Sequence, residues 1–108
     1  MSTISTHILD TTLGIPAAGI AVALFRVHDG VAVGTGVSDV DGRVRDLAST
    51  PATPGMYRMR FDTAAYFAAS SRETFYPEVN IVFSVADLAH YHVPLLLSPF
   101  GYTTYRGS

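Results

Sequence analysis

Alternation of apolar and polar side chains with a period of two is the feature that most constrains the fold of this chain. In residues 56–61, apolar side chains alternate with Arg58 and Arg60. Residues 4–9 and 20–25 show the same period. Because successive side chains of a β-strand point to opposite faces, this pattern predicts half-buried strands. Further strands are predicted at residues 31–37, from residue 43 onward, and at residues 79–85, 91–97 and 102–105.

Turn-forming residues separate these predicted strands. Residues 10–14 supply one turn, and the tripeptide His-Asp-Gly at 28–30 is typical of a hairpin. The Asp-Gly step at 41–42 predicts another tight turn, directly before the strand that begins at Arg43. Short strands joined by regular turns indicate an all-β sandwich, here of seven to eight strands.

One segment departs from the period of two and predicts a short helix. Residues 64–69 are rich in alanine, and their apolar spacing favours a helix. Asp62 or Thr63 can cap its N-terminus, and the helix is expected to end near Ser70 or Ser71. The predicted fold is therefore a β-sandwich with one short helix.

Size and composition limit both the organisation and the chemistry. At 108 residues the chain is predicted to be a single domain covering 1–108. With 48% hydrophobic and 15% charged residues, it has more apolar surface than so small a domain buries, so we expect an oligomer. Lysine and cysteine are absent, which excludes Schiff-base and thiol nucleophiles, disulfides and thiolate zinc sites. A net charge of −2 with scattered arginines argues against a nucleic-acid partner.

Targeting signals are sparse in the sequence. Residues 1–10 lack the basic and apolar regions of a secretory signal peptide. No apolar run reaches the about 18 residues that suggest a membrane span. We therefore expect a cytoplasmic protein with no membrane partner.

The four histidines are the main candidates for chemistry in a chain without lysine or cysteine. His28 lies in the predicted hairpin turn and is expected to be solvated. His90 and His92 are two residues apart in a strand, so both rings can point one way. The alternative is a pair of edge histidines, one facing solvent and one hydrogen-bonded. His7, on a half-buried strand, is either a functional group or a polar residue facing water.

Two arginines and the last residues of the sequence are the other candidates. Arg43 and Arg45 share a strand face, and they either form a solvated face or hold an oxyanion with their planar guanidinium groups. Residues 102–108 gather aromatic, guanidinium and hydroxyl groups, which is unusual for a frayed terminus. Two histidines bind a metal ion only with a third ligand, and no short-range ligand spacing is present, so we expect no metal.

Four segments of the sequence carry recognisable motifs. Residues 5–10 read STHILD, 41–43 read DGR, 90–98 read HYHVPLLLS and 105–108 read YRGS. Together these segments resemble the 5-hydroxyisourate hydrolases, also called transthyretin-related proteins. The resemblance covers essentially the whole chain, and the closing tetrapeptide is highly specific to the hydrolases. The hormone carrier transthyretin shares their fold but lacks this tetrapeptide and the set of histidines and arginine.

The resemblance implies a transthyretin-like (prealbumin-like) β-sandwich that assembles as a homotetramer, with active sites where dimers meet. It also implies hydrolysis of 5-hydroxyisourate to 2-oxo-4-hydroxy-4-carboxy-5-ureidoimidazoline in urate breakdown, a cyclic amide hydrolysis that uses no cofactor. By resemblance, the catalytic residues are His7, Arg43 and His92, while His90 is only a neighbour of the functional position. The same resemblance implies that substrate is bound by His7, Arg43, Tyr105 and Ser108, with Arg106 a weaker candidate.

The residue types suit such a reaction. A neutral imidazole, with a pKa of about 6.5, is poised to activate water near neutral pH. Our hypothesis is that His7 and His92 act as an acid and base pair, while Arg43 orients the substrate and stabilises the oxyanion. Which histidine is the base stays open. The alternatives are a non-catalytic tetrameric small-ligand carrier of transthyretin type and a structural or adhesive β-sandwich.

Overall fold

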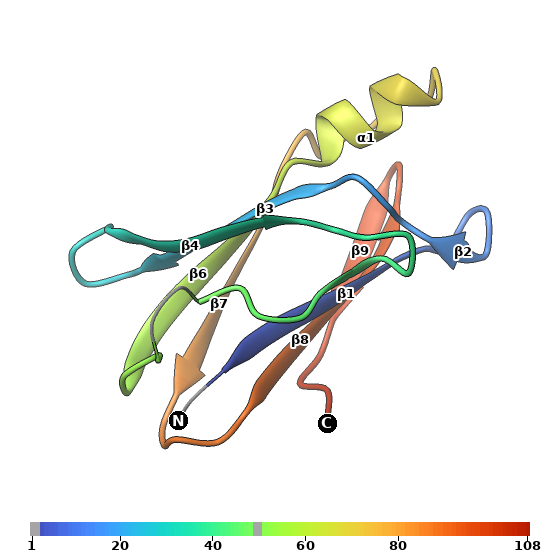
Figure 1. Ribbon diagram of the computed structural model, residues 1–108. Helices are drawn as coiled ribbons and strands as arrows, with labels where there is room; N and C mark the ends of the chain where they lie inside the picture. The colour runs from blue at the N-terminus through green and yellow to red at the C-terminus, as the bar shows by residue number, and fades with distance from the viewer. Residues whose placement is uncertain (1–2, 49–50) are drawn as a thin grey trace.

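The structure, a computed structural model, describes residues 3–48 and 51–108, and it contains two β-sheets and one short helix (Figure 1). The first sheet has the order β2-β1-β8-β9, and β5 also pairs with β1. β1 and β8 run parallel, and the other neighbours in this sheet run antiparallel. Its strands are β1 (Ile4–Asp10), β2 (Ile15–Pro16), β5 (Arg43–Val44), β8 (Tyr91–Ser98) and β9 (Gly101–Thr104).

The second sheet is antiparallel throughout and has the order β4-β3-β6-β7. On β6, Tyr57, Met59 and Phe61 are buried while Arg60 is exposed, which confirms the alternation seen in the sequence. The ladder between β3 and β4 shifts by one residue after Leu24. Its strands are β3 (Ala21–Arg26), β4 (Ala32–Val37), β6 (Gly55–Phe61) and β7 (Val79–Val85).

The hydrophobic core lies between the two sheets. The first sheet contributes Ile4 and Ile8 from β1 and Leu95 from β8, all fully buried. Leu24 and Met59 from the second sheet are fully buried in the same cluster. Because side chains alternate along each strand, the opposite face of β1 and β8 points away from this core. The predicted all-β sandwich is confirmed.

The predicted helix is present as α1 (Thr63–Ala69), directly after β6. Asp62 is its N-cap, and Asp62 Oδ1 accepts a hydrogen bond from the backbone N–H of Ala65 at 3.4 Å. Phe67 is fully buried and packs edge-to-face against Tyr66, with ring centroids 5.3 Å apart. The helix is therefore held by one apolar anchor and a capping carboxylate.

A buried carboxylate ties this helical region to the first sheet. Asp10, at the end of β1, accepts hydrogen bonds at 2.7 Å from Tyr66 Oη and from Arg72 Nη2. Burial alone would raise the pKa of Asp10, but these hydrogen bonds and the Arg72 charge outweigh it and lower the pKa. The carboxylate is thus held ionised inside the protein.

The described residues form nine strands, which adds a strand to the seven or eight expected from the sequence. The addition is β2, whose Pro16 lies opposite Leu9 of β1. Asp10 Oδ1 accepts the backbone N–H groups of Thr12 and Leu13 at 3.1 Å and so builds the turn that returns β2 to β1. Among the described residues, no helix has the length and apolar character needed to cross a membrane.

Candidate active site

Parallel pairing of β1 with β8 brings together residues that are far apart in the sequence. Ser5 lies opposite His92, and His7 lies opposite Pro94. On the other side of β1, Arg43 of β5 lies opposite His7. Paired residues project from the same face of a sheet. The histidines and the arginine therefore share the face of the first sheet that points away from the core.

A tight turn sets the start of β5 and so the position of Arg43. Asp39 Oδ1 accepts the backbone N–H groups of Asp41 and Arg43, both at 2.9 Å. Gly42 has a φ of 77°, and a Cβ at this position would lie 2.3 Å from the carbonyl oxygen of Ile8. Only glycine fits this left-handed position against β1. The turn predicted from the Asp-Gly step is therefore present, and it fixes the position at which Arg43 begins β5.

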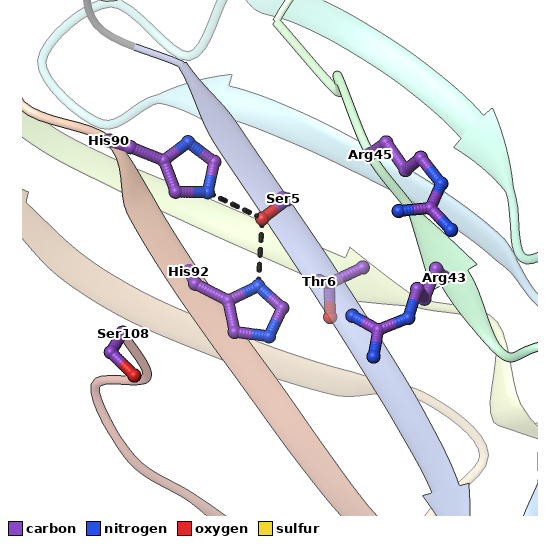
Figure 2. A pocket seen from close by; sticks show the side chains of 7 residues that line it. All are labelled: Ser5, Thr6, Arg43, Arg45, His90, His92 and Ser108. Carbon is purple, nitrogen blue, oxygen red and sulfur yellow. Dashed lines mark hydrogen bonds between the residues drawn. The ribbon is translucent and has the colours of Figure 1, made fainter.

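An open pocket of about 220 Å³ lies on this face of the sheet. In Figure 2, His90 and His92 stand on one side of Ser5, the guanidinium groups of Arg43 and Arg45 approach from the other, and Ser108 lies beyond the histidines. The lining residues are Ser5, Thr6, Arg43, Arg45, His90, His92 and Ser108. The lining is rich in groups that bind or protonate a polar molecule.

His92 of β8 and His90, directly before β8, are linked through one hydroxyl group. Ser5 Oγ lies 2.7 Å from Nδ1 of His92 and 2.9 Å from Nε2 of His90 (Figure 2). The two imidazole planes are inclined by 18°, with centroids 6.4 Å apart. On its far side, His90 Nδ1 contacts Oγ1 of Thr3. Both rings point the same way, as residues two apart in a strand allow, and both are hydrogen-bonded.

The surroundings of His92 disfavour its charged form. Burial of the half-buried ring lowers its pKa, and the nearby charge of Arg43 lowers it further. His90 and His7 act in the same direction when they are protonated. His92 is therefore a neutral imidazole near neutral pH, with Nδ1 held by Ser5.

The last residues fold back along β8. The backbone N–H of Gly107 donates to the carbonyl oxygen of His92 at 2.9 Å, which places Ser108 at the pocket. The guanidinium carbon of Arg106 lies 4.7 Å from the centre of the Tyr91 ring. Tyr105 and Arg106 line a second groove of about 340 Å³ toward β7, which shares only His92 with the first pocket.

The structure brings some of the predicted site residues together and leaves others apart. Arg43, His92 and Ser108 line one pocket, and His7 lies beside it, in register with Arg43. Tyr105 and Arg106 face the second groove within one chain. Their functional roles stay predictions. His28 is an exposed turn residue, with 81% of its side chain accessible.

Sequence reasoning did not identify the hydroxyl group that joins the two imidazoles. Ser5 shares a strand face with His7, and His90 shares one with His92, so alternation alone places all four on candidate faces. The missing information was that β1 pairs with β8 in this register. Among the residues that the structure describes, no three His, Cys, Asp or Glu side chains gather to hold a metal ion.

Known proteins resemble this chain over its whole length. A model of the HIUase/Transthyretin family matches residues 4–107. A Schizosaccharomyces pombe protein named probable 5-hydroxyisourate hydrolase is 42% identical over 114 residues, covering 97% of this chain and 90% of its own. A solved structure of Klebsiella pneumoniae 5-hydroxyisourate hydrolase has a TM-score of 0.92 and 39% identity, covering 100% of both chains.

A transthyretin is also similar to this chain in fold. Sea bream transthyretin, solved in complex with thyroxine, has a TM-score of 0.88 and 33% identity, covering 97% of this chain and 94% of its own. The transthyretin-like sandwich expected from the sequence is thereby confirmed. The match over residues 4–107 shows that this chain belongs to the HIUase/Transthyretin family.

Proposed function

We propose that this protein hydrolyses 5-hydroxyisourate to 2-oxo-4-hydroxy-4-carboxy-5-ureidoimidazoline, and that the pocket beside His92 is its active site. Relatives named 5-hydroxyisourate hydrolase align along nearly the whole chain, which supports the activity. The observation that carries the assignment of the site is the convergence of Arg43, His92 and Ser108, from three separate segments, on one pocket.

In this proposal, His92 is the general base that activates water. Its Nδ1 is engaged by Ser5, so Nε2 is the nitrogen left for the reaction. The lowered pKa of His92 keeps the imidazole neutral, as a base requires. Water loses a proton to Nε2, and the hydroxide attacks the carbonyl carbon of the cyclic amide. The carbon–nitrogen bond then breaks, and His7 donates a proton to the leaving ring nitrogen.

The positive charge beside the base stabilises the intermediate. The guanidinium of Arg43 faces the pocket and can hold the carbonyl oxygen as negative charge develops on it. Ser108 supplies a hydroxyl group for the ring of the substrate. We assign Tyr105 and Arg106 to substrate contact as well, and since they face the second groove, this role requires closure of the site by another copy.

The polar lining supports a hydrolase over a carrier. The Klebsiella hydrolase and sea bream transthyretin both share this fold, so the fold does not separate the two functions. A pocket for an apolar ligand needs only a few polar groups, whereas this one presents two imidazoles and two guanidinium groups. Such a lining suits acid–base chemistry on a small polar heterocycle.

We also propose that the protein is a homotetramer with its sites at the dimer–dimer interface. Large apolar side chains stay exposed in one chain, including Phe75, Phe100, Val82 and Tyr105. A molecular mass in solution of four times 11.6 kDa would support the tetramer, and one of 11.6 kDa would contradict it. The single domain over 1–108 and the cytoplasmic location stay predictions.

The direct test of the activity is optical. Freshly generated 5-hydroxyisourate loses its near-ultraviolet absorbance slowly on its own. We expect catalytic amounts of the protein to accelerate this decay, whereas a carrier or a structural protein would leave the rate unchanged.

A further inference from the structure

The hydroxyl group of Ser5 stands between two imidazole rings, and this arrangement restricts where their protons lie. A serine hydroxyl carries one proton and accepts through two lone pairs. Its contacts with His92 Nδ1 and His90 Nε2 therefore cannot both be donated by Ser5. One of the two imidazoles must donate its own N–H to Ser5 Oγ.

Two proton arrangements satisfy both hydrogen bonds. In the first, His92 donates from Nδ1 to Ser5, and Ser5 donates to Nε2 of His90, so His92 presents an unprotonated Nε2 to the pocket. In the second, His90 donates to Ser5, Ser5 donates to Nδ1 of His92, and Nε2 of His92 carries the proton. Only the first arrangement leaves His92 ready to act as a base.

Charge and burial favour a positive charge on His90 over one on His92 after a proton has been taken from water. His92 is half-buried and faces the positive charge of Arg43, with His7 close by. His90 is exposed, and its Nδ1 contacts Thr3 Oγ1 at the edge of the sheet. An imidazolium at His90 therefore keeps its hydration, whereas one at His92 loses part of it.

We propose that Ser5 and His90 are positioning residues that relay the proton taken up by His92. This inference rests on the proposed function, in which His92 is the base. As His92 Nε2 takes a proton from water, its Nδ1 proton moves to Ser5 Oγ, and the Ser5 proton moves to Nε2 of His90. Three bonds break, an O–H bond of water, the Nδ1–H bond of His92 and the O–H bond of Ser5, and three form, Nε2–H of His92, a new O–H of Ser5 and Nε2–H of His90. The positive charge ends on His90.

The overall reaction produces one proton, which the relay stores on His90 until product leaves. Hydrolysis of the cyclic amide yields a carboxylic acid, which ionises at neutral pH, and a ureido nitrogen, which stays neutral. The proton of this acid restores His7 after His7 has protonated the leaving nitrogen. When product leaves, the same transfers run in reverse: His90 returns its Nε2 proton to Ser5, Ser5 returns a proton to Nδ1 of His92, and His92 Nε2 releases one proton to solvent. Each turnover thus releases one proton and returns all side chains to their starting states.

Two substitutions interrupt the relay at different points. Ser5→Ala removes the bridging hydroxyl, while His90→Gln keeps a polar partner for Ser5 that cannot carry a proton away. We expect each to lower kcat at least about tenfold, with KM changed less than twofold, since a positioned proton acceptor contributes about 10²–10⁴-fold. The double variant should be no slower than the slower single variant, because the two groups act as a unit. His28→Gln is the matched control, because His28 is exposed in a distant turn.

A spectroscopic measurement separates a relay from a merely structural role. Nitrogen-15 NMR of the histidines should show His92 protonated at Nδ1 in the active protein, with a shift toward the Nε2–H tautomer in Ser5→Ala. Ser5→Thr restores a hydroxyl group and should recover both the tautomer and part of the activity. Circular dichroism checks that each variant is folded. Because His90 is exposed, its substitution tests the relay even if substitution of the buried Ser5 disturbs folding.

The outcomes distinguish this inference from the proposed function. If the wild-type protein hydrolyses 5-hydroxyisourate but Ser5→Ala and His90→Gln keep full kcat, the relay is wrong and the function stands. Multiplicative losses in the double variant, or a wild-type His92 protonated at Nε2, would equally contradict the relay. If the wild-type protein shows no activity, the proposed function fails, and the tautomer of His92 still reports on the hydrogen-bonded chain.

Discussion

Gly107 packs directly against the imidazole ring of His92. A Cβ atom at residue 107 would lie 2.6 Å from Cδ2 of His92 and 3.1 Å from Cγ of Pro94. The same glycine donates its backbone N–H to the carbonyl oxygen of His92 at 2.9 Å. Gly107 therefore contacts both the backbone and the imidazole ring of His92, and this contact leaves no room for a larger residue at position 107.

Gly107→Ala is expected to displace the His92 ring or the tail. A shift of about 1 Å in a catalytic group costs up to about a hundredfold in rate, so we expect kcat to fall between about ten- and a hundredfold. Steady-state kinetics measure the effect, with Gly101→Ala as the control. A Cβ at Gly101 would meet only Ser98 Oγ, at 3.8 Å, so this variant should keep its activity. Equal kinetics for the two variants would show that the contact with His92 is not important.

Deletion of residues 105–108 should abolish turnover and leave the sandwich folded. The segment pairs with β8 through one bridge at Gly107 and stacks Arg106 on Tyr91, whereas the hydrophobic core lies between the sheets. Circular dichroism should therefore be unchanged while activity falls to background. A truncated protein that retains activity would mean that the tail only covers the sheet.

Removal of the Arg43 charge should raise the pKa of His92. A neighbouring cation disfavours the imidazolium, so Arg43→Gln makes protonation of His92 easier and moves its titration to higher pH. NMR titration of the His92 ring measures this shift without requiring activity. Arg45→Gln is the matched control, because Arg45 lines the pocket but is not among the groups that lower this pKa. A His92 pKa that is unchanged or lower in Arg43→Gln would contradict the electrostatic description of the site.

Loss of the buried carboxylate at residue 10 should destabilise the fold. Asp10→Asn leaves the guanidinium of Arg72 without its anionic partner, and we expect a loss of roughly 3 kcal/mol in the free energy of unfolding. We expect a loss at the low end of the range for breaking a buried ion pair, because 21% of the Arg72 side chain is exposed. Urea denaturation measures the change, and the exposed Asp46→Asn should show almost none.

The same carboxylate predicts how stability depends on acid. The folded-state pKa of Asp10 is lowered, so the unfolded chain binds a proton first as the pH falls. The contribution of Asp10 is therefore complete above about pH 4 and is lost as the pH falls from there through the lowered pKa. In Asp10→Asn this part of the acid dependence should disappear. An Asp10→Asn variant that loses stability below about pH 4 as steeply as the wild type would contradict this assignment.

Sequence periodicity was enough to place most strands and to assign side chains to faces. The alternation around His7 predicted β1, and the apolar run from Tyr91 predicted β8. Both predictions were possible because the pattern of a strand is contained in its own residues. The Asp-Gly step also predicted the turn before Arg43. These features are local, since each depends on residues that are close in the chain.

The parts that the sequence left undetermined depend on partners across the fold. Pairing of Ser5 with His92 joins residues that are 87 positions apart, and neither strand's period specifies the register between them. The short β2 was missed because its pairing depends on the turn built by Asp10. The sequence also left open whether one or both of His90 and His92 are hydrogen-bonded, because the hydroxyl group that binds both rings comes from another strand.

Substitution of His92 by asparagine, assayed on freshly generated 5-hydroxyisourate, tests the proposed site most directly. Catalytic amounts of the wild-type protein should accelerate the loss of near-ultraviolet absorbance. His92→Asn should return the decay to its spontaneous rate while its circular dichroism and molecular mass stay those of the wild type. Full activity in a folded His92→Asn protein would contradict the assignment of His92 as the base, and no acceleration by the wild type would contradict the hydrolase function itself.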